Sequence, residues 1–188
     1  MASHLNKIFL ISLMLLYISF SKDISTFSNY EIIRQTNVEL HFSVDFKNKI
    51  LEGTEKIYFT ALEDGEVIIL DILSLKINSV IDCDTGEELE FIIANQYEID
   101  KLGVPLKIYK EFNKGDQLTL LLKFHSTKEG MSAAWLEPEK TSGEIYPFMY
   151  SQGEPILNRA LFPTQDTSSV KLPYSVNLTV EEPLLVLK

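Results

Sequence analysis

The sequence contains one cysteine, so an intrachain disulfide cannot form. A chain of 188 residues is long enough to bury an apolar core without one, and Cys83 is expected to be a small, buried, apolar residue. Positive charge is also scarce, because 17 lysines and arginines face 27 aspartates and glutamates, which gives a formal net charge of -10. This balance argues against a nucleic-acid partner, whose phosphates would be repelled.

No apolar run reaches the roughly 20 residues that a membrane-spanning helix needs. The longest one, Ile8–Phe20, follows a segment that carries Lys7 and no acidic residue, and Ser19 and Ser21 place small residues where a signal peptidase cleaves. We therefore predict a secretory signal peptide over residues 1–21 and a secreted protein without a stable membrane span. The alternatives are an uncleaved signal anchor that attaches the chain to a membrane, and a spurious upstream start.

The rest of the chain shows the period of β-strands. Apolar residues occupy every second position from Val38 to Phe46, and the intervening polar residues, His41 among them, are expected on the opposite face. Further strands are expected over 57–60, 67–73, 77–81, 89–93, 106–109 and 118–124, separated by turn residues. Residues 127–143 have the composition of a loop. Together these patterns predict an all-β domain of saddle-like or sandwich-like antiparallel sheets.

The segment from Tyr150 to Lys171 carries a resemblance. It reads YSQGEPILNRALFPTQDTSSVK and resembles the corresponding segment of the M1 zinc aminopeptidases, in particular the leukotriene A4 hydrolase and aminopeptidase B branch. Supporting matches lie at Trp135-Leu136 with Pro138, at Thr141-Ser142-Gly143, at residues 41–46 and at residues 51–54. The similarity extends from about residue 35 to the end of the chain, so the resemblance implies the amino-terminal β-domain of such an enzyme.

The resemblance implies a role for the loop that contains Gln152 and Glu154. In this family a saddle-like domain packs against a thermolysin-like catalytic domain, and a Gln-x-Glu or Gln-x-Gln element binds the free amine of the substrate. A cationic amine that leaves bulk water needs an acceptor at hydrogen-bond distance, and a carboxylate suits it best. Glutamate at this position resembles the general aminopeptidase version, which favours peptides over an epoxide substrate. Outside this context, Gln-Gly-Glu would be read as a surface turn.

Other residues of the segment fall on the family pattern and are expected to shape the loop: Gly153, Pro155, Arg159, Pro163 and Asp166. The family holds the peptide bond after the Glu or Gln in the cis form, so the Glu154–Pro155 bond is predicted to be cis. Asp166 is expected to cap the main-chain amides of Ser168 or Ser169. Thr164 stands where the family often has cysteine, a departure expected to matter little.

The zinc site of the family is not encoded in this chain. Hydrolysis requires zinc held by two histidines and a glutamate, typically within His-Glu-x-x-His, with a second glutamate as general base. The three histidines are His4, His41 and His125, and none precedes a glutamate. We therefore predict no catalytic residue, metal ligand or cofactor here, and zinc in the full-length family only.

The expected organisation is a leader over 1–21, a lead-in over 22–34 and an incomplete M1 amino-terminal β-domain over 35–188, without the catalytic zinc domain. The predicted function is that of a fragment of a secreted zinc aminopeptidase, inactive alone, whose partner is a peptide substrate. The alternative is a free-standing secreted β-module that binds peptides or a homologous peptidase. The sequon Asn177-Leu178-Thr179 could be glycosylated in the secretory route, or could be paired within a sheet.

Overall fold

The computed structural model describes residues 23–94, 102–128, 130–131 and 133–186, so the predicted leader and His4 lie outside the described residues. The described chain is built from strands, with two short 3-10 helices, η2 (Pro138–Lys140) and η3 (Asn158–Ala160). The strands are β1 (Ile33–Asp45), β2 (Ile50–Ala61), β3 (Gly65–Ile72), β4 (Leu75–Asp82), β5 (Phe91–Ile93), β6 (Val104–Phe112), β7 (Gln117–Ser126), β8 (Ala133–Leu136), β9 (Phe148–Ser151) and β10 (Tyr174–Thr179). The predicted all-β class is confirmed.

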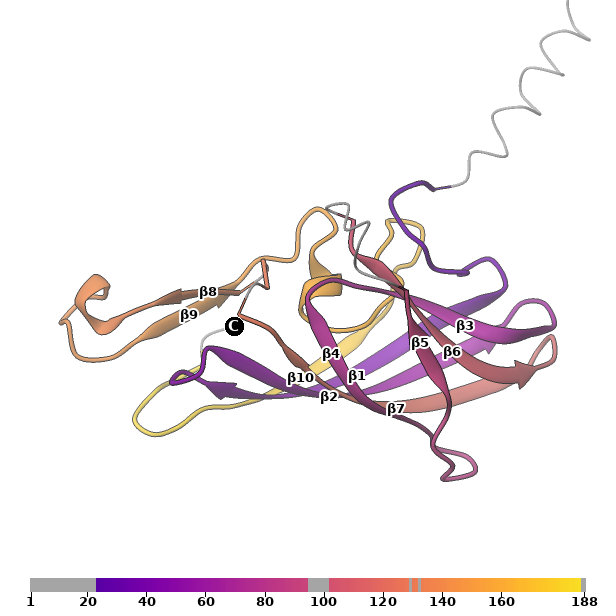
Figure 1. Cartoon of the computed structure of the whole chain (residues 1–188), viewed down its shortest axis with the longest axis horizontal. Coiled ribbons are helices and arrows are strands. Elements are labelled where there is room, and N and C mark those ends of the chain that lie inside the picture. The colour runs from indigo at the N-terminus through magenta and orange to yellow at the C-terminus, as the bar shows by residue number, and fades with distance from the viewer. Residues whose placement is uncertain (1–22, 95–101, 129, 132, 187–188) are drawn as a thin grey trace, which may run out of the picture.

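The strands form a five-stranded sheet of order β10-β1-β2-β7-β4, a three-stranded sheet of order β3-β6-β5, and the two-stranded ribbon β8-β9 (Figure 1). Neighbours are antiparallel as predicted, except that β10 runs parallel to β1. Because period-2 alternation sends apolar side chains to one face, Val38, Leu40 and Phe42 are buried while His41 is exposed. Core-facing side chains of the two larger sheets belong to one hydrophobic cluster.

The hairpin between β1 and β2 sets the register of the larger sheet. In its turn Asp45 accepts a hydrogen bond from the Asn48 main-chain amide at 2.8 Å, and Lys49 adopts a positive φ of 58°. This turn places Leu40 opposite Glu55 and Phe42 opposite Gly53. A Cβ atom at Gly53 would lie 2.3 Å from the ring of Phe124 on β7, so the absence of a side chain there makes room for that ring.

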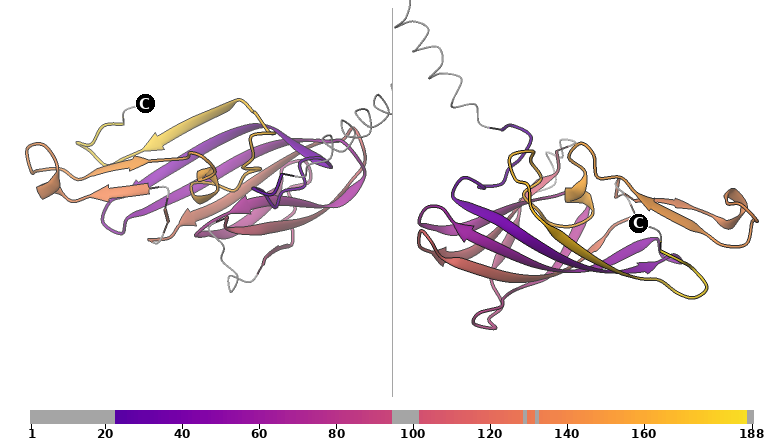
Figure 2. Two further views of the ribbon diagram at one scale, coloured as in Figure 1. Left: turned by 90° about the horizontal axis from the view of Figure 1, so that it is seen from above. Right: turned by 180° about the vertical axis from the view of Figure 1, so that it is seen from behind.

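The ribbon β8-β9 corrects the prediction of a loop over residues 127–143. It extends from the body of the domain and lies above the end of the larger sheet (Figures 1 and 2). Trp135 packs edge-on against Phe46, with ring centroids 5.5 Å apart, whereas Phe148 and Tyr150 are exposed and contact each other. The contact between Trp135 and Phe46 joins segments far apart in sequence, which explains why local composition alone indicated a loop.

Cys83 is exposed, so the prediction that it is buried was wrong. The residue follows the end of β4, where Asp82 takes the core-facing position and binds Lys110 Nζ at 2.5 Å. At the end of this strand the buried side chain is therefore Asp82, paired with Lys110, and its neighbour Cys83 faces solvent. Among the described residues, no helix has the length and apolar character required to cross a bilayer.

Candidate functional site

The loop that carries Gln152 and Glu154 begins where β9 ends at Ser151. Both side chains are exposed, and neither makes a hydrogen bond or an ion pair with any described residue. The Glu154–Pro155 peptide bond is cis, as predicted. The loop therefore presents one amide and one carboxylate to solvent.

The main chain of this loop forms a tight turn that lies against the Asn158 side chain. The Leu157 amide donates to the Gly153 carbonyl at 2.8 Å, which closes a tight turn. A Cβ atom at Gly153 would lie 2.3 Å from Asn158 Oδ1, so the Asn158 side chain occupies the space that any other residue would need. Asn158 could not be predicted from the sequence, because nothing in the local pattern shows that its side chain turns back to Gly153.

Arg159 lies on η3 and is fully buried. Its Nε and Nη2 atoms donate to Asp166 Oδ2 at 3.1 Å and to the Asp166 carbonyl at 2.7 Å. Nη1 donates to the Leu102 carbonyl at 2.6 Å, and Nη2 also donates to the Ser25 carbonyl at 2.8 Å. One guanidinium thus connects the lead-in, the residues just before β6 and the segment after the loop.

Asp71 on β3 is the second carboxylate beside Arg159, at 3.8 Å from Nη1. It accepts hydrogen bonds from the amides of Phe27 at 2.7 Å and Asp166 at 3.1 Å, and from the Thr26 hydroxyl. Burial raises the pKa of Asp71, whereas these hydrogen bonds and Arg159 act to lower it. Asp71 was not predicted as a site residue, although a lone acid within an apolar strand is a visible signal in the sequence.

The predicted cap by Asp166 was wrong, because its carboxylate is used elsewhere. Oδ2 accepts hydrogen bonds from the main-chain amide and the guanidinium of Arg159, and Oδ1 accepts one from Asn158 Nδ2 at 3.4 Å. The Ser169 amide instead donates to Thr167 Oγ1 at 3.1 Å. Asp166 therefore links Asn158, beneath the loop, to buried Arg159.

The residues after the loop are fixed to the core. Pro163 and Thr164 are buried, and Thr164 exchanges main-chain hydrogen bonds with Asp71 at 2.8 and 3.2 Å. The Thr164 hydroxyl also donates to Gln35 Oε1 at 3.0 Å. Both flanks of the exposed loop are thus anchored in β-structure or in the buried network.

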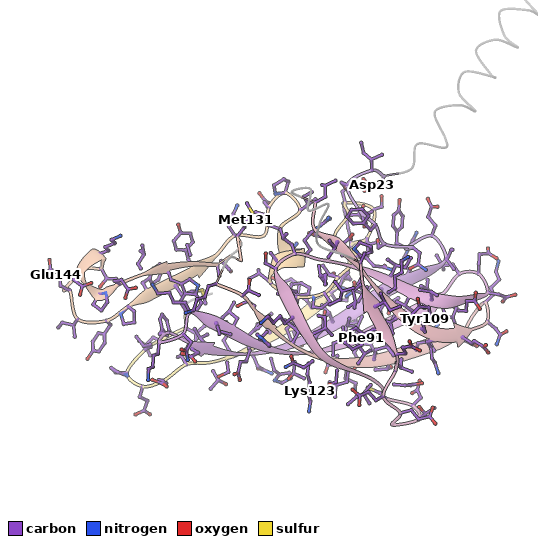
Figure 3. All side chains as sticks on the ribbon, viewed as in Figure 1. Asp23, Phe91, Tyr109, Lys123, Met131 and Glu144 are labelled. Atoms are coloured by element: carbon purple, nitrogen blue, oxygen red, sulfur yellow. The ribbon has the colours of Figure 1, made fainter. Side chains whose placement is uncertain are left out.

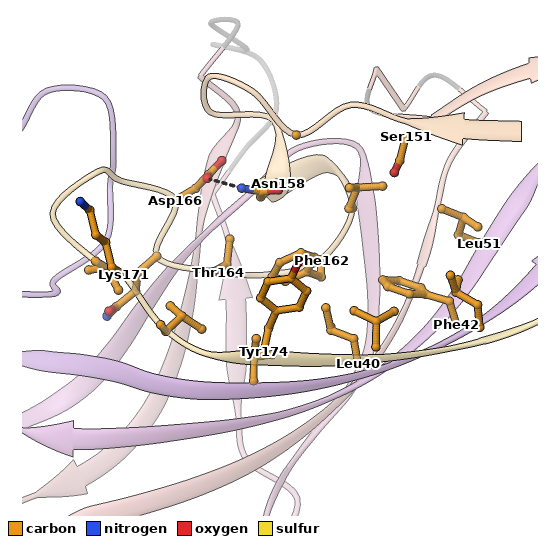
Figure 4. Close-up of a pocket in the computed structure, with 18 of the residues that line it drawn as sticks. Leu40, Phe42, Leu51, Ser151, Asn158, Phe162, Thr164, Asp166, Lys171 and Tyr174 are labelled. Carbon is orange, nitrogen blue, oxygen red and sulfur yellow. Dashed lines mark hydrogen bonds between the residues drawn. The ribbon is translucent and has the colours of Figure 1, made fainter. Parts of the chain in front are cut away.

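An apolar groove of about 660 Å³ lies between this segment and the larger sheet (Figure 4). Leu40 and Phe42 belong to its floor, and Asn158 and Phe162 line the side formed by the segment above. Ser151 and Gly153 lie at the groove, whereas Gln152 and Glu154 are not among its lining residues. The two predicted amine-binding residues therefore stand at the margin of the groove rather than inside it.

The donor set of the described residues does not fit a zinc site. His41 on β1 and His125 on β7 are separated by β2, on which Thr54 is opposite His41 and Glu52 is opposite His125. No group of three His, Cys, Asp or Glu side chains converges in the part of the chain that the structure describes. No chemical step through a metal can be built from these residues.

Asn177 of the sequon is exposed and lies on β10, paired in register with His41 on β1. Its Nδ2 atom is 3.4 Å from His41 Nδ1. The strand is therefore paired through its backbone while the acceptor side chain remains on the solvent side, so sheet pairing does not remove Asn177 from the surface.

These features can be compared with known proteins. The family model for the peptidase M1 N-terminal domain matches residues 26–187. The chain belongs to the M1 peptidase family. It is 30% identical over 164 residues to a leucine aminopeptidase 2 of Yarrowia lipolytica, covering 87% of this chain and 25% of that protein. It is 32% identical over 172 residues to a leukotriene A-4 hydrolase homolog of Botryotinia fuckeliana, covering 89% and 26%.

Solved structures agree with this assignment to the M1 family. Native yeast LTA4 hydrolase matches 90% of this chain with a TM-score of 0.78 and 30% identity, over 26% of its own length. An M1 zinc metallopeptidase from Deinococcus radiodurans matches with a TM-score of 0.62 and 16% identity, covering 84% of this chain and 35% of that one, and shows the fold alone. The chain spans about a quarter of the length of the curated relatives it matches, and corresponds to their N-terminal M1 domain.

Proposed function

We propose that this M1 N-terminal domain supplies free-amine recognition to a secreted zinc aminopeptidase that removes amino-terminal residues from peptides. Gln152 and Glu154 bind the amine, and the described residues provide no catalytic group. Zinc and the general base belong to a catalytic domain outside this chain. The relatives leucine aminopeptidase 2 and leukotriene A-4 hydrolase homolog support the reaction class.

The observation that carries this proposal is an exposed, unpaired carboxylate on a firmly held loop. Glu154 has no partner among the described residues, while Asn158 lies against Gly153 and hydrogen-bonds Asp166, which pairs with buried Arg159. A carboxylate that is already paired would have to break that pairing to bind an amine. A free one can form a charge-assisted hydrogen bond with the ammonium group without breaking another contact.

The test uses a longer polypeptide in which this segment precedes a zinc peptidase domain. Glu154→Gln should lower kcat/KM for an aminoacyl-fluorophore by about 10- to 100-fold, the equivalent of a charged hydrogen bond worth about 1.5–3 kcal/mol. Glu139→Gln, an exposed acid on η2, is the matched control and should leave kcat/KM unchanged. Equal activity of Glu154→Gln and the unmodified enzyme would exclude amine recognition by Glu154.

The alternative, a free-standing binding module, is supported by the open apolar groove of about 660 Å³, which is within the size range of ligand sites. Intact-mass measurement of the natural product, with an aminopeptidase assay on the same sample, separates the two proposals. A species much heavier than the 21.5 kDa of this chain, with zinc-dependent activity, favours the enzyme. A stable, inactive species of this chain's length favours the module.

The proposed location of the protein is outside the cell or within the secretory route. Residues 1–21 are proposed to direct the chain into the secretory route, with an uncleaved anchor as the alternative. Amino-terminal sequencing of the mature protein tests this directly. A product that begins after Ser21 supports secretion, and a membrane-bound product that retains Met1 supports the anchor.

A further inference from the structure

Glu55 occupies a core position of the five-stranded sheet. It lies on β2, where burial alternates, and it shares the core face with Gly53 and Ile57. Its direct neighbours across the sheet are Leu40 on β1 and Leu122 on β7. The side chain is 0% exposed, so a carboxyl group stands where the pattern of the strand requires an apolar residue.

The carboxyl group has no partner among the described residues. Neither Oε1 nor Oε2 accepts or donates a hydrogen bond there. By contrast, the other buried acids are paired: Asp71 and Asp166 with Arg159, and Asp82 with Lys110. Glu55 is therefore the exception among the buried acids of the described chain.

No charged side chain of the surrounding strands faces Glu55. The buried positions of β1, β6 and β7 carry apolar side chains apart from Gln35 and Ser126. The buried acids of β3 and β4 are Asp71 and Asp82, which are held by the contacts given above. Burial is the only cause that raises the pKa of Glu55 well above its ordinary value of 4.5, and no cation opposes it.

We propose that protonation of Glu55 controls the pairing of the central strand of the larger sheet. β2 stays paired with β1 and β7 when the carboxyl group is neutral, and this pairing weakens when the group ionises. An unpaired carboxylate cannot remain in an apolar core, so ionisation requires that water reach it. Leu40, opposite Glu55, also lines the apolar groove, so weaker pairing of β1 with β2 would reach the floor of the groove. The inference does not depend on the proposed peptidase function.

The direction of the pH effect follows from proton linkage. The folded chain holds a proton on Glu55 at pH values where the unfolded chain has released it. The contribution of the neutral acid to stability is therefore complete below the ordinary pKa of 4.5 and is lost as the pH rises toward the raised pKa of the folded state. Within this window the unfolding equilibrium constant should rise by up to about tenfold per pH unit.

The experiment compares urea denaturation of the 188-residue chain and its Glu55→Gln variant at a series of pH values between 5 and 8. The unmodified chain should lose stability relative to Glu55→Gln as pH rises, by up to about tenfold in the unfolding constant per unit. Glu52→Gln is the matched control, since Glu52 is an exposed acid on the same strand. It should follow the unmodified chain, and parallel pH profiles for Glu55→Gln and the unmodified chain would overturn the proposal.

A second measurement uses the unmodified chain and does not depend on whether a variant folds. Infrared spectra of the unmodified chain at pH values above the ordinary glutamate pKa of 4.5 should show the carbonyl band of a protonated carboxylic acid. Exchange of the main-chain amide hydrogens of Leu40 and Leu122 should accelerate with pH more than their intrinsic chemical exchange rates do. Glu55→Leu, if folded, removes the band. Loss of this band at the ordinary pKa of glutamate, as exposed acids would show, would overturn the proposal, whatever the variants do.

Discussion

Arg159 donates hydrogen bonds from Nε and Nη2 to the side-chain and main-chain oxygens of Asp166, at 3.1 and 2.7 Å. The main-chain amide of Arg159 also donates to the Asp166 side chain, at 3.2 Å from Oδ2. This pairing closes the segment between the exposed loop and the buried network. A buried charge pair thus fixes the segment that follows the loop carrying Gln152 and Glu154.

Replacement of Arg159 by Ala should strongly destabilise the domain. It leaves the carboxylates of Asp71 and Asp166 buried without their cation, and loss of one partner of a buried pair costs about 3–5 kcal/mol. The free energy of unfolding by urea denaturation measures the effect. Arg34→Ala, at an exposed position of β1, is the control and should change stability by less than about 0.5 kcal/mol. A small effect at Arg159 would mean that the network is not needed for the fold.

Gly153 and Asn158 should be energetically coupled. Gly153→Ala brings a methyl group to 2.3 Å from Oδ1 of the exposed Asn158 side chain, which must turn away and lose its hydrogen bond to Asp166. Loss of one such hydrogen bond costs about 0.5–1.5 kcal/mol. Asn158→Ala removes the obstructing atom, so the double variant should recover part of the loss. A double-mutant cycle by urea denaturation should give a coupling energy of about 0.5–3 kcal/mol. Simple additivity would show that the loop moves away from Asn158 without cost.

Gly103 should be much less tolerant of alanine than Gly86. Both have positive φ, 81° and 76°, so both variants carry the same conformational penalty of about 1–2 kcal/mol. At Gly103 a Cβ atom would also lie 2.2 Å from the Ile72 carbonyl oxygen, whereas nothing lies within 4 Å at Gly86. Gly103→Ala should therefore be less stable than Gly86→Ala by a further 1–3 kcal/mol or so in urea denaturation. Equal losses would contradict the close approach of the two backbones.

The strands could be predicted where the side-chain period is local. From Val38 to Phe46 the alternation is uninterrupted, and the structure follows it. On β2 the prediction began only at Ile57, because Glu55 and Lys56 hide an alternation that the structure carries back to Ile50. The buried acid was therefore invisible until its neighbours Leu40 and Leu122 were known.

The residues of the candidate site also fall into those that could be predicted from the sequence and those whose roles depend on tertiary contacts. Gln152 and Glu154 could be named from a contiguous sequence resemblance, and the same resemblance gave the cis bond that precedes Pro155. The roles of Asn158 and Asp71 come from contacts across the fold, which no local pattern encodes. The wrong assignment of a cap to Asp166 has the same origin, since the competing partner Arg159 reaches it only through the tertiary structure.

The chain should be glycosylated at Asn177 if it enters the secretory route. The Asn177 side chain is exposed on β10 even though the backbone of the strand is paired with β1, so an acceptor nitrogen is available on the solvent side. Secretory expression should give a species whose apparent mass falls on treatment with an N-glycosidase.

Thr179→Ala should abolish this shift, because it destroys the sequon, whereas Thr179→Ser preserves the motif and should retain the shift. The two variants differ little in size at an exposed edge position, so any difference between them reports on glycan attachment rather than on folding. A secreted, unmodified chain that carries Thr179 would show that pairing of β10 precedes and prevents access of the transferase. Retention of the chain inside the cell with no glycan would instead contradict the predicted leader.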